Sequence, residues 1–210
     1  MRAARFHSDK GLDPVEGAPP TDAALTAYRS LRKAEGGPGD SMAVVGVGGL
    51  GSFGVQFGRL WACRVVAVDR GPAELERAEE LSADAAVGTD GSVPRDIEAA
   101  ASGPVDVVVD FVGADETLRW ASNILGADGH LVLAGIGGGS IEFAWNPLVG
   151  SEMTYRTVQW GNPAELQDVL DLARQGRLSV NVEPVGLADL SATLERLDTG
   201  NIEDRAVAVP

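Results

Sequence analysis

Cysteine and histidine are scarce in this chain of 210 residues. Cys63 is the single cysteine, so the chain can form no internal disulfide and no cysteine-based zinc cage. The two histidines, His7 and His130, stand far apart in the sequence. We therefore expect no bound metal, and we expect Cys63 to be a small buried residue of an apolar helix. His130 is interpreted as structural.

Basic residues are also few, because 17 Lys and Arg oppose 31 Asp and Glu, for a formal net charge of −14. Nucleic acids and anionic lipids bind to clustered positive charge, so we expect neither a nucleic acid nor a membrane as a partner. No apolar run approaches the ~20 residues that cross a bilayer. No apolar segment follows the charged first ten residues, as it would in a secretory signal. These features predict a cytoplasmic protein.

Apolar runs alternate with amphipathic segments along most of the chain. We expect strands at 1–7, 42–47, 64–69, 85–87, 105–111 and 131–136, with helices at 23–33, 50–62, 72–81, 93–101 and 116–125. Beyond them we expect strands at 141–145, 153–159, near 182 and at 205–209, with helices at 164–175 and 187–197. This order predicts the α/β class, as a Rossmann doubly wound parallel sheet covered on both faces. The Rossmann domain is expected at 21–180, after a terminal segment at 1–20 and before a C-terminal segment at 181–210.

A glycine-rich turn follows the apolar run at 42–47. Its residues, in the pattern G-x-G-x-x-G, are Gly46, Val47, Gly48, Gly49, Leu50 and Gly51. In a dinucleotide-binding turn the first glycine allows the tight bend, the second lets the pyrophosphate approach, and the third lets helix and strand pack closely. The helix that begins here offers free N–H groups and a positive dipole end to phosphates. The sequence therefore predicts a dinucleotide site.

An acidic residue ends the next strand. Asp69 lies 18 residues after Gly51, close to the ~20 expected for a carboxylate that binds the adenosine ribose. A carboxylate there repels a 2′-phosphate, so NAD is favoured over NADP. Arg70 follows directly and is able to lie over the adenine or to meet a 2′-phosphate.

Several further stretches, in this order, carry a family resemblance from about Gly11 to the end of the chain. The chain resembles the zinc-type alcohol dehydrogenases of the medium-chain dehydrogenase/reductase superfamily. The matching stretches are GLDPVEGAPPTDAALTAYRSL, VVGVGGLGSFGVQFGRL, VVAVDR, VDVVVDFVGADET, GHLVLAGIGGG, WGNPAELQDVLDLARQGRL and RAVAVP.

Compared with members of the family that it resembles, the chain lacks most of the N-terminal catalytic domain. The stretch MRAARFH resembles the first strand of that domain, and the chain then passes almost directly to GLDPVEGAPP. The terminal segments are accordingly interpreted as a small remnant of the catalytic domain. The resemblance implies that the Cys and His ligands of the catalytic zinc and the four-cysteine structural site are absent. Asp22 stands at the third zinc-ligand position, and one carboxylate does not make a zinc site.

The resemblance also carries over contacts to the cofactor. It implies that Thr26 lies beside the nicotinamide and that Arg205 reaches the pyrophosphate. Glu74 departs from the family pattern, in which a basic residue is common near that position. Backbone contacts to the nicotinamide ribose and carboxamide are implied for four residues that follow the fourth and fifth strands, namely Val112, Gly113, Gly135 and Ile136.

Without zinc, alcohol oxidation needs a general acid or base. The candidates near the expected nicotinamide edge are Asp22, Thr26 and Tyr28. Two of them also have a structural interpretation that stays open, because Thr21 or Asp22 is suited to capping a helix and Tyr28 to packing on the sheet. Trp145 and Trp160 are candidates for lining a substrate pocket or for packing in the core.

Three functional hypotheses remain open on the sequence. The first is an NAD(H)-dependent, zinc-free oxidoreductase acting on a small molecule. The second is a non-redox enzyme, such as a cyclase, isomerase or lyase, built on the same scaffold. The third is a non-catalytic dinucleotide-binding or partner protein. A homodimer joined through the sheet edge at 141–145 and 153–159 is also expected, because an open edge invites pairing and the resembled family dimerises there.

Overall fold

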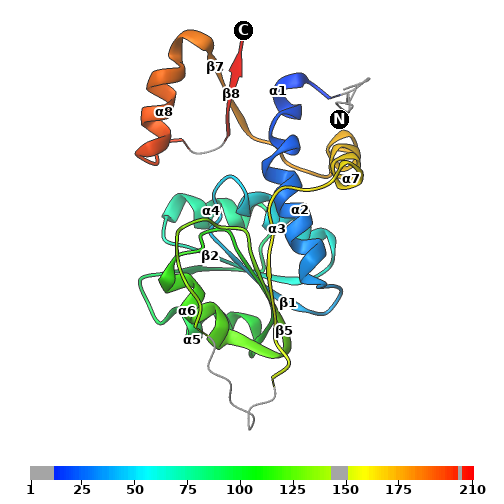
Figure 1. Cartoon of the computed structure of the whole chain (residues 1–210), viewed down its shortest axis with the longest axis vertical. Helices are drawn as coiled ribbons and strands as arrows, with labels where there is room; N and C mark the ends of the chain where they lie inside the picture. The colour runs from blue at the N-terminus through cyan, green and yellow to red at the C-terminus, as the bar shows by residue number, and fades with distance from the viewer. Residues whose placement is uncertain (1–11, 143–150, 203–204) are drawn as a thin grey trace.

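A six-stranded parallel sheet lies at the centre of the fold (Figure 1). The computed structural model describes residues 12–142, 151–202 and 205–210. The sheet has the strand order β3-β2-β1-β4-β5-β6. Its strands are β1 Ser41–Val45, β2 Arg64–Asp69, β3 Ala85–Gly88, β4 Val105–Asp110, β5 Leu125–Leu133 and β6 Thr154–Thr157. The strand order reverses between β1 and β4, as in a doubly wound fold, which confirms the predicted Rossmann architecture.

Helices cover both faces of this sheet. They are α2 Ala23–Ala34, α3 Gly51–Leu60, α4 Pro72–Glu80, α5 Val93–Ala101, α6 Asp115–Ile124 and α7 Pro163–Arg174. On one face, α2, α3, α4 and α7 share a core with Val44 and Val107, and on the other α5 and α6 share a core with Val45 and Val108. Successive residues of a strand point to opposite faces, so a continuous apolar run supplies both cores.

A second, smaller sheet carries the C-terminal part of the chain. Strands β7 Val182–Gly186 and β8 Arg205–Val209 pair in parallel, and α8 Leu190–Asp198 connects them after a short 3-10 helix, Leu187–Asp189. Figure 1 shows this unit beyond one end of the large sheet, with α1 Pro14–Gly17 beside β7. This arrangement supports the division expected near residue 180, which stays a prediction.

The strand expected at 131–136 begins earlier and ends earlier than its apolar run indicates. β5 begins at Leu125, where its first residue pairs with Val105 of β4, and a register shift follows before His130 pairs with Val107. The intervening sequence, GADG, has no apolar alternation that reveals a strand. β5 ends at Leu133, where the chain enters a glycine-rich loop.

Some expected elements differ or fall outside the described residues. The strand at 1–7 and most of that at 141–145 lie outside them, and Ile141 and Glu142 are not in a strand. Two short helices were not expected, α1 and a 3-10 helix at Pro19–Thr21. The carboxylate of Asp13 accepts a hydrogen bond from the Val15 N–H at 2.8 Å, which caps α1 in a stretch that is otherwise too rich in proline and glycine to predict a helix.

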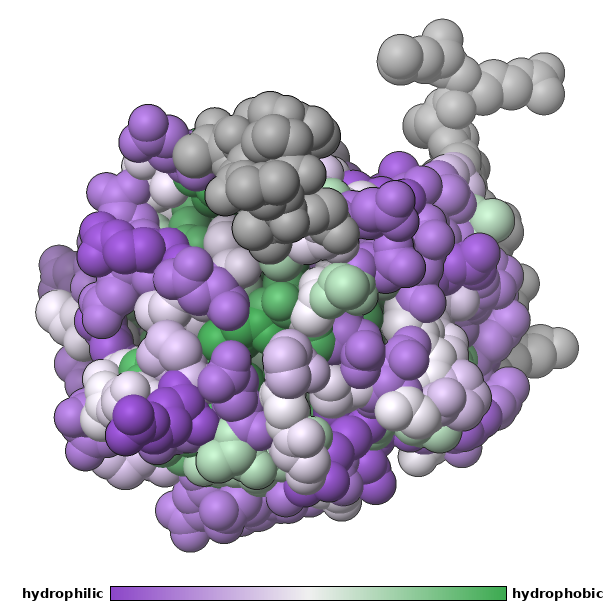
Figure 2. All heavy atoms as spheres, turned by 90° about the horizontal axis from the view of Figure 1, so that it is seen from below, coloured by the Kyte–Doolittle hydropathy of each residue, from purple (hydrophilic) through white to green (hydrophobic). Residues whose placement is uncertain are grey.

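The surface seen from below is mainly hydrophilic, with apolar residues toward its centre (Figure 2). None of the helices within the described ranges combines the length and the apolar character needed to cross a membrane.

Candidate functional site

The glycine turn lies between β1 and α3, and two of its glycines are required by its own geometry. Gly46 has a φ of +81°, and a Cβ on it would lie 2.6 Å from the Val112 side chain. A Cβ on Gly51 would collide with the carbonyl oxygen of Gly46. These positions confirm the tight bend and the close helix–strand packing expected of the first and third glycines.

Gly48 differs from its two neighbours because a Cβ on it would meet no atom within 4 Å. The fold itself therefore does not require glycine at this position. The open space in front of Gly48 belongs to a cleft of about 580 Å³ at the carboxyl ends of β1, β2 and β4. This is the edge at which doubly wound sheets bind ligands.

The cleft brings together most of the residues predicted to bind a dinucleotide. These are Gly46, Gly48, Gly49, Leu50, Gly51, Asp69, Arg70 and Val112. Glu74 also lines it, as do Thr89, Phe111, Ala114, Glu116, Thr117 and Trp120, which the sequence did not single out. Gly113, Gly135, Ile136 and Arg205 are not among its lining residues, and neither are Asp22, Thr26 and Tyr28.

Asp69 connects the glycine turn with the end of β2. One carboxylate oxygen accepts a hydrogen bond from the Val47 N–H at 2.7 Å, and the other accepts one from the Gly71 N–H at 2.9 Å. Glu74 lies next to this group, since a Cβ on Gly71 would collide with its carboxylate. Two carboxylates, with Arg70 beside them, thus face the end of the cleft predicted to hold the adenosine ribose.

Asp110 is a site residue that the sequence analysis missed. It ends β4 fully buried, with a relative exposure of 0%. Its carboxylate accepts hydrogen bonds from the N–H groups of Val112 at 2.7 Å and Gly113 at 2.9 Å, and from the Thr117 hydroxyl at 2.7 Å. An acidic residue directly after the apolar run at 107–109 was the available signal, because a buried carboxylate requires partners.

The loops that follow β4 and β5 lie against each other. The Gly137 N–H donates to the Val112 carbonyl, and the Gly139 N–H to the Gly113 carbonyl, both at 2.9 Å. Gly135 is packed so closely on this backbone that a Cβ would collide with Val112. The structure therefore places Gly113 and Gly135 together. The side chain of Ile136 is 98% exposed.

Arg205 and Asp22 form an ion pair beside the glycine turn. The Arg205 guanidinium donates to the Asp22 carboxylate at 2.9 Å. A Cβ on Gly49 would lie 2.8 Å from Arg205 Cδ and 3.0 Å from its Nη1, so this side chain lies over the turn. Asp22 precedes α2, but its side chain makes no capping hydrogen bond, which corrects the capping interpretation. The Thr26 hydroxyl donates to the Asp22 carbonyl at 2.9 Å.

Tyr28 lies apart from Asp22, in an aromatic cluster with α3. Its ring contacts Phe57 and Trp61, with centroid distances of 5.3 and 5.5 Å, and its hydroxyl donates to Asp168 at 3.0 Å. Burial raises the pKa of this hydroxyl above its usual value. Tyr28 therefore packs against Phe57 of α3, in the same buried core as the sheet residues Val44 and Val107, and Asp168 already engages its hydroxyl.

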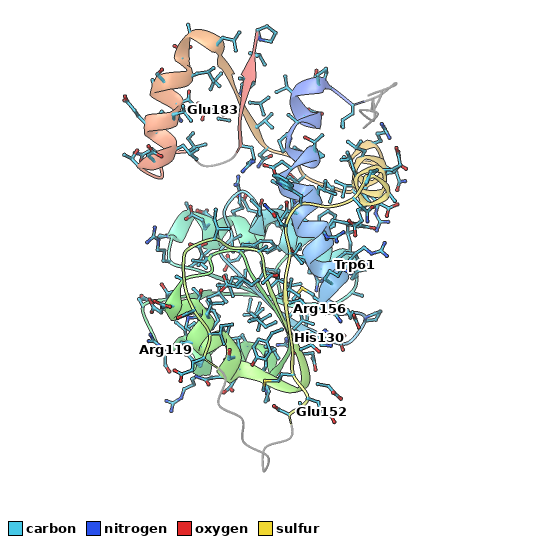
Figure 3. All side chains as sticks on the ribbon, viewed as in Figure 1. Trp61, Arg119, His130, Glu152, Arg156 and Glu183 are labelled. Carbon is cyan, nitrogen blue, oxygen red and sulfur yellow. The ribbon has the colours of Figure 1, made fainter. Side chains whose placement is uncertain are left out.

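Cys63, His130 and Trp160 also lie outside the cleft. Cys63 is buried in the turn after α3 rather than within a helix, and burial raises the pKa of its thiol to about 11. His130 lies in β5, where Figure 3 shows it near Arg156, and its buried Nδ1 has no hydrogen-bond partner. Trp160 is 64% exposed, and Trp145 lies outside the described residues.

Within the described ranges, no three His, Cys, Asp or Glu side chains are grouped so as to hold a metal ion. The sheet, the glycine turn and its acidic partner nevertheless form one cleft with the chemistry of a dinucleotide site.

The model of the zinc-binding dehydrogenase family matches residues 49–175, and the chain belongs to this family. It is 31% identical over 200 residues to probable cinnamyl alcohol dehydrogenase 8A of Oryza sativa subsp. japonica, covering 93% of this chain and 54% of that protein. Its identity to an alcohol dehydrogenase of Geobacillus stearothermophilus is 28% over 196 residues, covering 93% of this chain and 58% of that protein. The chain thus spans somewhat over half the length of these curated relatives.

Solved structures show the same likeness. The alcohol dehydrogenase of Aeropyrum pernix superposes with a TM-score of 0.86 at 36% identity, covering 93% of this chain and 58% of that one. An acetophenone reductase from Geotrichum candidum, solved in complex with NAD, superposes with a TM-score of 0.84 at 27% identity, covering 96% of this chain and 57% of that one. These matches agree with the alcohol-dehydrogenase-type Rossmann fold.

Proposed function

We propose that this chain binds NAD(H) and forms the dinucleotide-binding part of an alcohol-dehydrogenase-type oxidoreductase acting on a small molecule. The observation that carries the proposal is Gly48, where an open cleft faces a glycine that the fold does not need. The N-terminus of α3 lies at the same turn and offers N–H groups to a pyrophosphate. The NAD-bound reductase that resembles the chain adds support.

A preference for NAD over NADP is the finer part of the proposal. Asp69 and Glu74 place two carboxylates in the cleft on α4's side, and among the described residues that line the cleft Arg70 carries the positive charge. A 2′-phosphate at that end of the cleft meets net negative charge, whereas a ribose hydroxyl donates to a carboxylate. We therefore expect NADH to bind more tightly than NADPH.

When bound, the nicotinamide supplies the hydride acceptor or donor. The chain's own residues hold the rest of the dinucleotide, because the turn at 46–51 leaves space for the pyrophosphate and Arg205 offers it positive charge.

Of the three residues predicted to handle a proton, Asp22 lies beside the turn, because its carboxylate accepts a hydrogen bond from Arg205. Thr26 donates its hydroxyl proton to a helix carbonyl, and Tyr28 donates its own to Asp168. We keep Asp22, Thr26 and Tyr28 together as the proton-handling candidates, and loss of turnover in Asp22→Asn or Tyr28→Phe tests this part of the proposal.

Calorimetric titration with NADH tests the dinucleotide proposal. Gly48→Val fills the open space, and we expect it to weaken NADH binding at least about tenfold while the unfolding midpoint changes little. Gly37→Val is the matched control, because a Cβ on Gly37 also meets no atom within 4 Å but lies outside the cleft. Wild-type affinity for NADH no better than for an unrelated nucleotide would refute the proposal. Catalysis without any nicotinamide would instead favour the non-redox alternative.

We further propose that the protein is zinc-independent, since Asp22 is the single expected zinc-ligand position that the sequence retains. Elemental analysis that finds one tightly held zinc per chain would contradict this.

The cytoplasmic location expected from the sequence also stays a proposal, which cell fractionation tests.

We also propose a homodimer joined through β6, the last strand in the order of the large sheet. The Val158 N–H donates to the Leu133 carbonyl of β5 at 2.9 Å. N–H groups alternate along a strand, so that of Thr157 faces away from β5. Thr157→Pro removes this donor, and light scattering at micromolar concentration should then report a monomer. Thr157→Ala, which keeps the N–H, should stay dimeric, whereas a monomeric wild-type protein would disprove the dimer.

A further inference from the structure

The ion pair between Arg205 and Asp22 joins two segments that lie far apart in the sequence. Arg205 begins β8, Asp22 precedes α2, and 183 positions separate them in the sequence. The Arg205 Nη2 lies 2.9 Å from Asp22 Oδ2, and the side chains are 34% and 57% exposed. Water therefore reaches both charges, and a pair of this kind exchanges partners readily.

Arg205 lies where a pyrophosphate is expected. Its Cδ and Nη1 lie so close to Gly49 that a Cβ there would approach within 2.8 and 3.0 Å. The guanidinium is thus held over the glycine turn, and Asp22 is the anion it contacts in the described structure. Arg205 also lines a small hollow with Arg77 of α4, and Asp69 and Glu74 lie in the adjoining cleft.

We propose that Asp22 competes with the dinucleotide for Arg205 and so lowers the affinity of the glycine turn for a pyrophosphate. This inference rests on the proposed function. The Asp22 carboxylate at 2.9 Å offsets part of the guanidinium charge that a diphosphate would otherwise meet. A bound pyrophosphate must either displace Asp22 from Arg205 or lie close to its negative charge. Both routes weaken binding, so Asp22 sets how tightly the nucleotide is held.

The expected effect follows from charge alone. Asp22→Asn keeps the shape of the side chain and its preference for the position before a helix, but it removes the negative charge. A unit charge a few ångströms from a phosphate, screened by water, changes an affinity by about 3- to 10-fold. We expect Asp22→Asn to bind NADH more tightly by that factor. Because the effect is electrostatic, it should shrink as the salt concentration rises.

A double-mutant cycle assigns the effect to Arg205. NADH dissociation constants are measured calorimetrically for wild type, Asp22→Asn, Arg205→Gln and the double variant, each checked by circular dichroism. Competition for Arg205 predicts that the tightening caused by Asp22→Asn falls below about twofold in the Arg205→Gln background. Glu195→Gln, which removes an exposed charge on α8, is the control for net charge and should leave binding unchanged.

Two results would overturn the inference. Equal or weaker NADH binding by Asp22→Asn would mean that Asp22 positions Arg205 for the nucleotide instead of competing for it. Tightening that persists in the Arg205→Gln background would mean that Asp22 repels the nucleotide without involving Arg205. Absence of NADH binding in every variant would refute the proposed function together with this inference, whereas the first two results leave the proposed function standing.

Discussion

The carboxylate of Asp69 accepts a hydrogen bond from the backbone N–H of Val47 at 2.7 Å, and thereby fixes the glycine turn to the end of the neighbouring strand. Its second oxygen accepts from the Gly71 N–H at 2.9 Å, at the start of the connection to α4. The residue that the sequence assigns to a ribose therefore also holds two backbone segments of the cleft wall together.

Asp69→Ala should destabilise the protein in the absence of nucleotide. Two N–H groups of the cleft wall lose their partners, and we expect the free energy of unfolding to fall by about 1–3 kcal/mol. Urea unfolding without nucleotide measures this loss. Glu76→Ala, at an exposed position of α4, is the control and should change the value by less than about 0.5 kcal/mol. Equal stability of Asp69→Ala and wild type would show that Asp69 serves the ligand alone.

Asp110 should contribute more than Asp69, because it is fully buried and accepts three hydrogen bonds. Asp110→Ala leaves two backbone N–H groups and the Thr117 hydroxyl without this acceptor, and we expect a loss of about 2–4 kcal/mol. Thr117→Val removes one of the three bonds and should cost about 1 kcal/mol. Hydrogen exchange at Val112 and Gly113 should accelerate in Asp110→Ala. Unchanged exchange at these amides would contradict this role.

Glu165 should make stability depend on pH. Burial by itself would raise the pKa of its carboxyl, but the Asn162 N–H at 2.8 Å and the Arg29 guanidinium at 2.7 Å outweigh it and lower the pKa from its usual value. A pKa that is lower in the folded state stabilises the protein above the unfolded-state value, and this stabilisation disappears as the pH falls through the folded-state value.

Glu165→Gln should therefore cost about 1.5–3 kcal/mol at neutral pH. The difference from wild type should shrink as the pH falls below 4.5. Urea unfolding across this range measures it. Glu183→Gln, which breaks the exposed pair with Arg196, is the comparison and should have a much smaller effect. A cost for Glu165→Gln that is constant with pH would contradict the charge-based explanation.

The sequence pattern was sufficient to predict those elements in which backbone geometry and burial repeat regularly along the chain. The apolar runs at 42–45 in β1 and 107–109 in β4 predict strands buried on both faces, and Val44 and Val108 lie in the two separate cores that such strands require. The spacing of Gly46 and Gly51 predicts the turn, because Gly46 has a positive φ and a Cβ on Gly51 would collide with the Gly46 carbonyl oxygen five residues earlier. The start of β5 was not predicted, because the residues GADG between Leu125 and His130 carry no apolar pattern and Leu125 joins the strand by pairing with Val105 of β4.

The sequence by itself determined the order of the elements, the glycine turn and the acid that follows it, since these depend on periodicity and short spacing. Only the tertiary structure decided which distant side chains meet. Arg205 donates a hydrogen bond to Asp22, which lies 183 positions away in the sequence. Tyr28 donates one to Asp168, which lies 140 positions away. Such pairs depend on how helices and the second sheet pack around the first. A single sequence holds no local signal for that packing, because a polar residue shows the same type whether it faces water, a ligand or a distant partner.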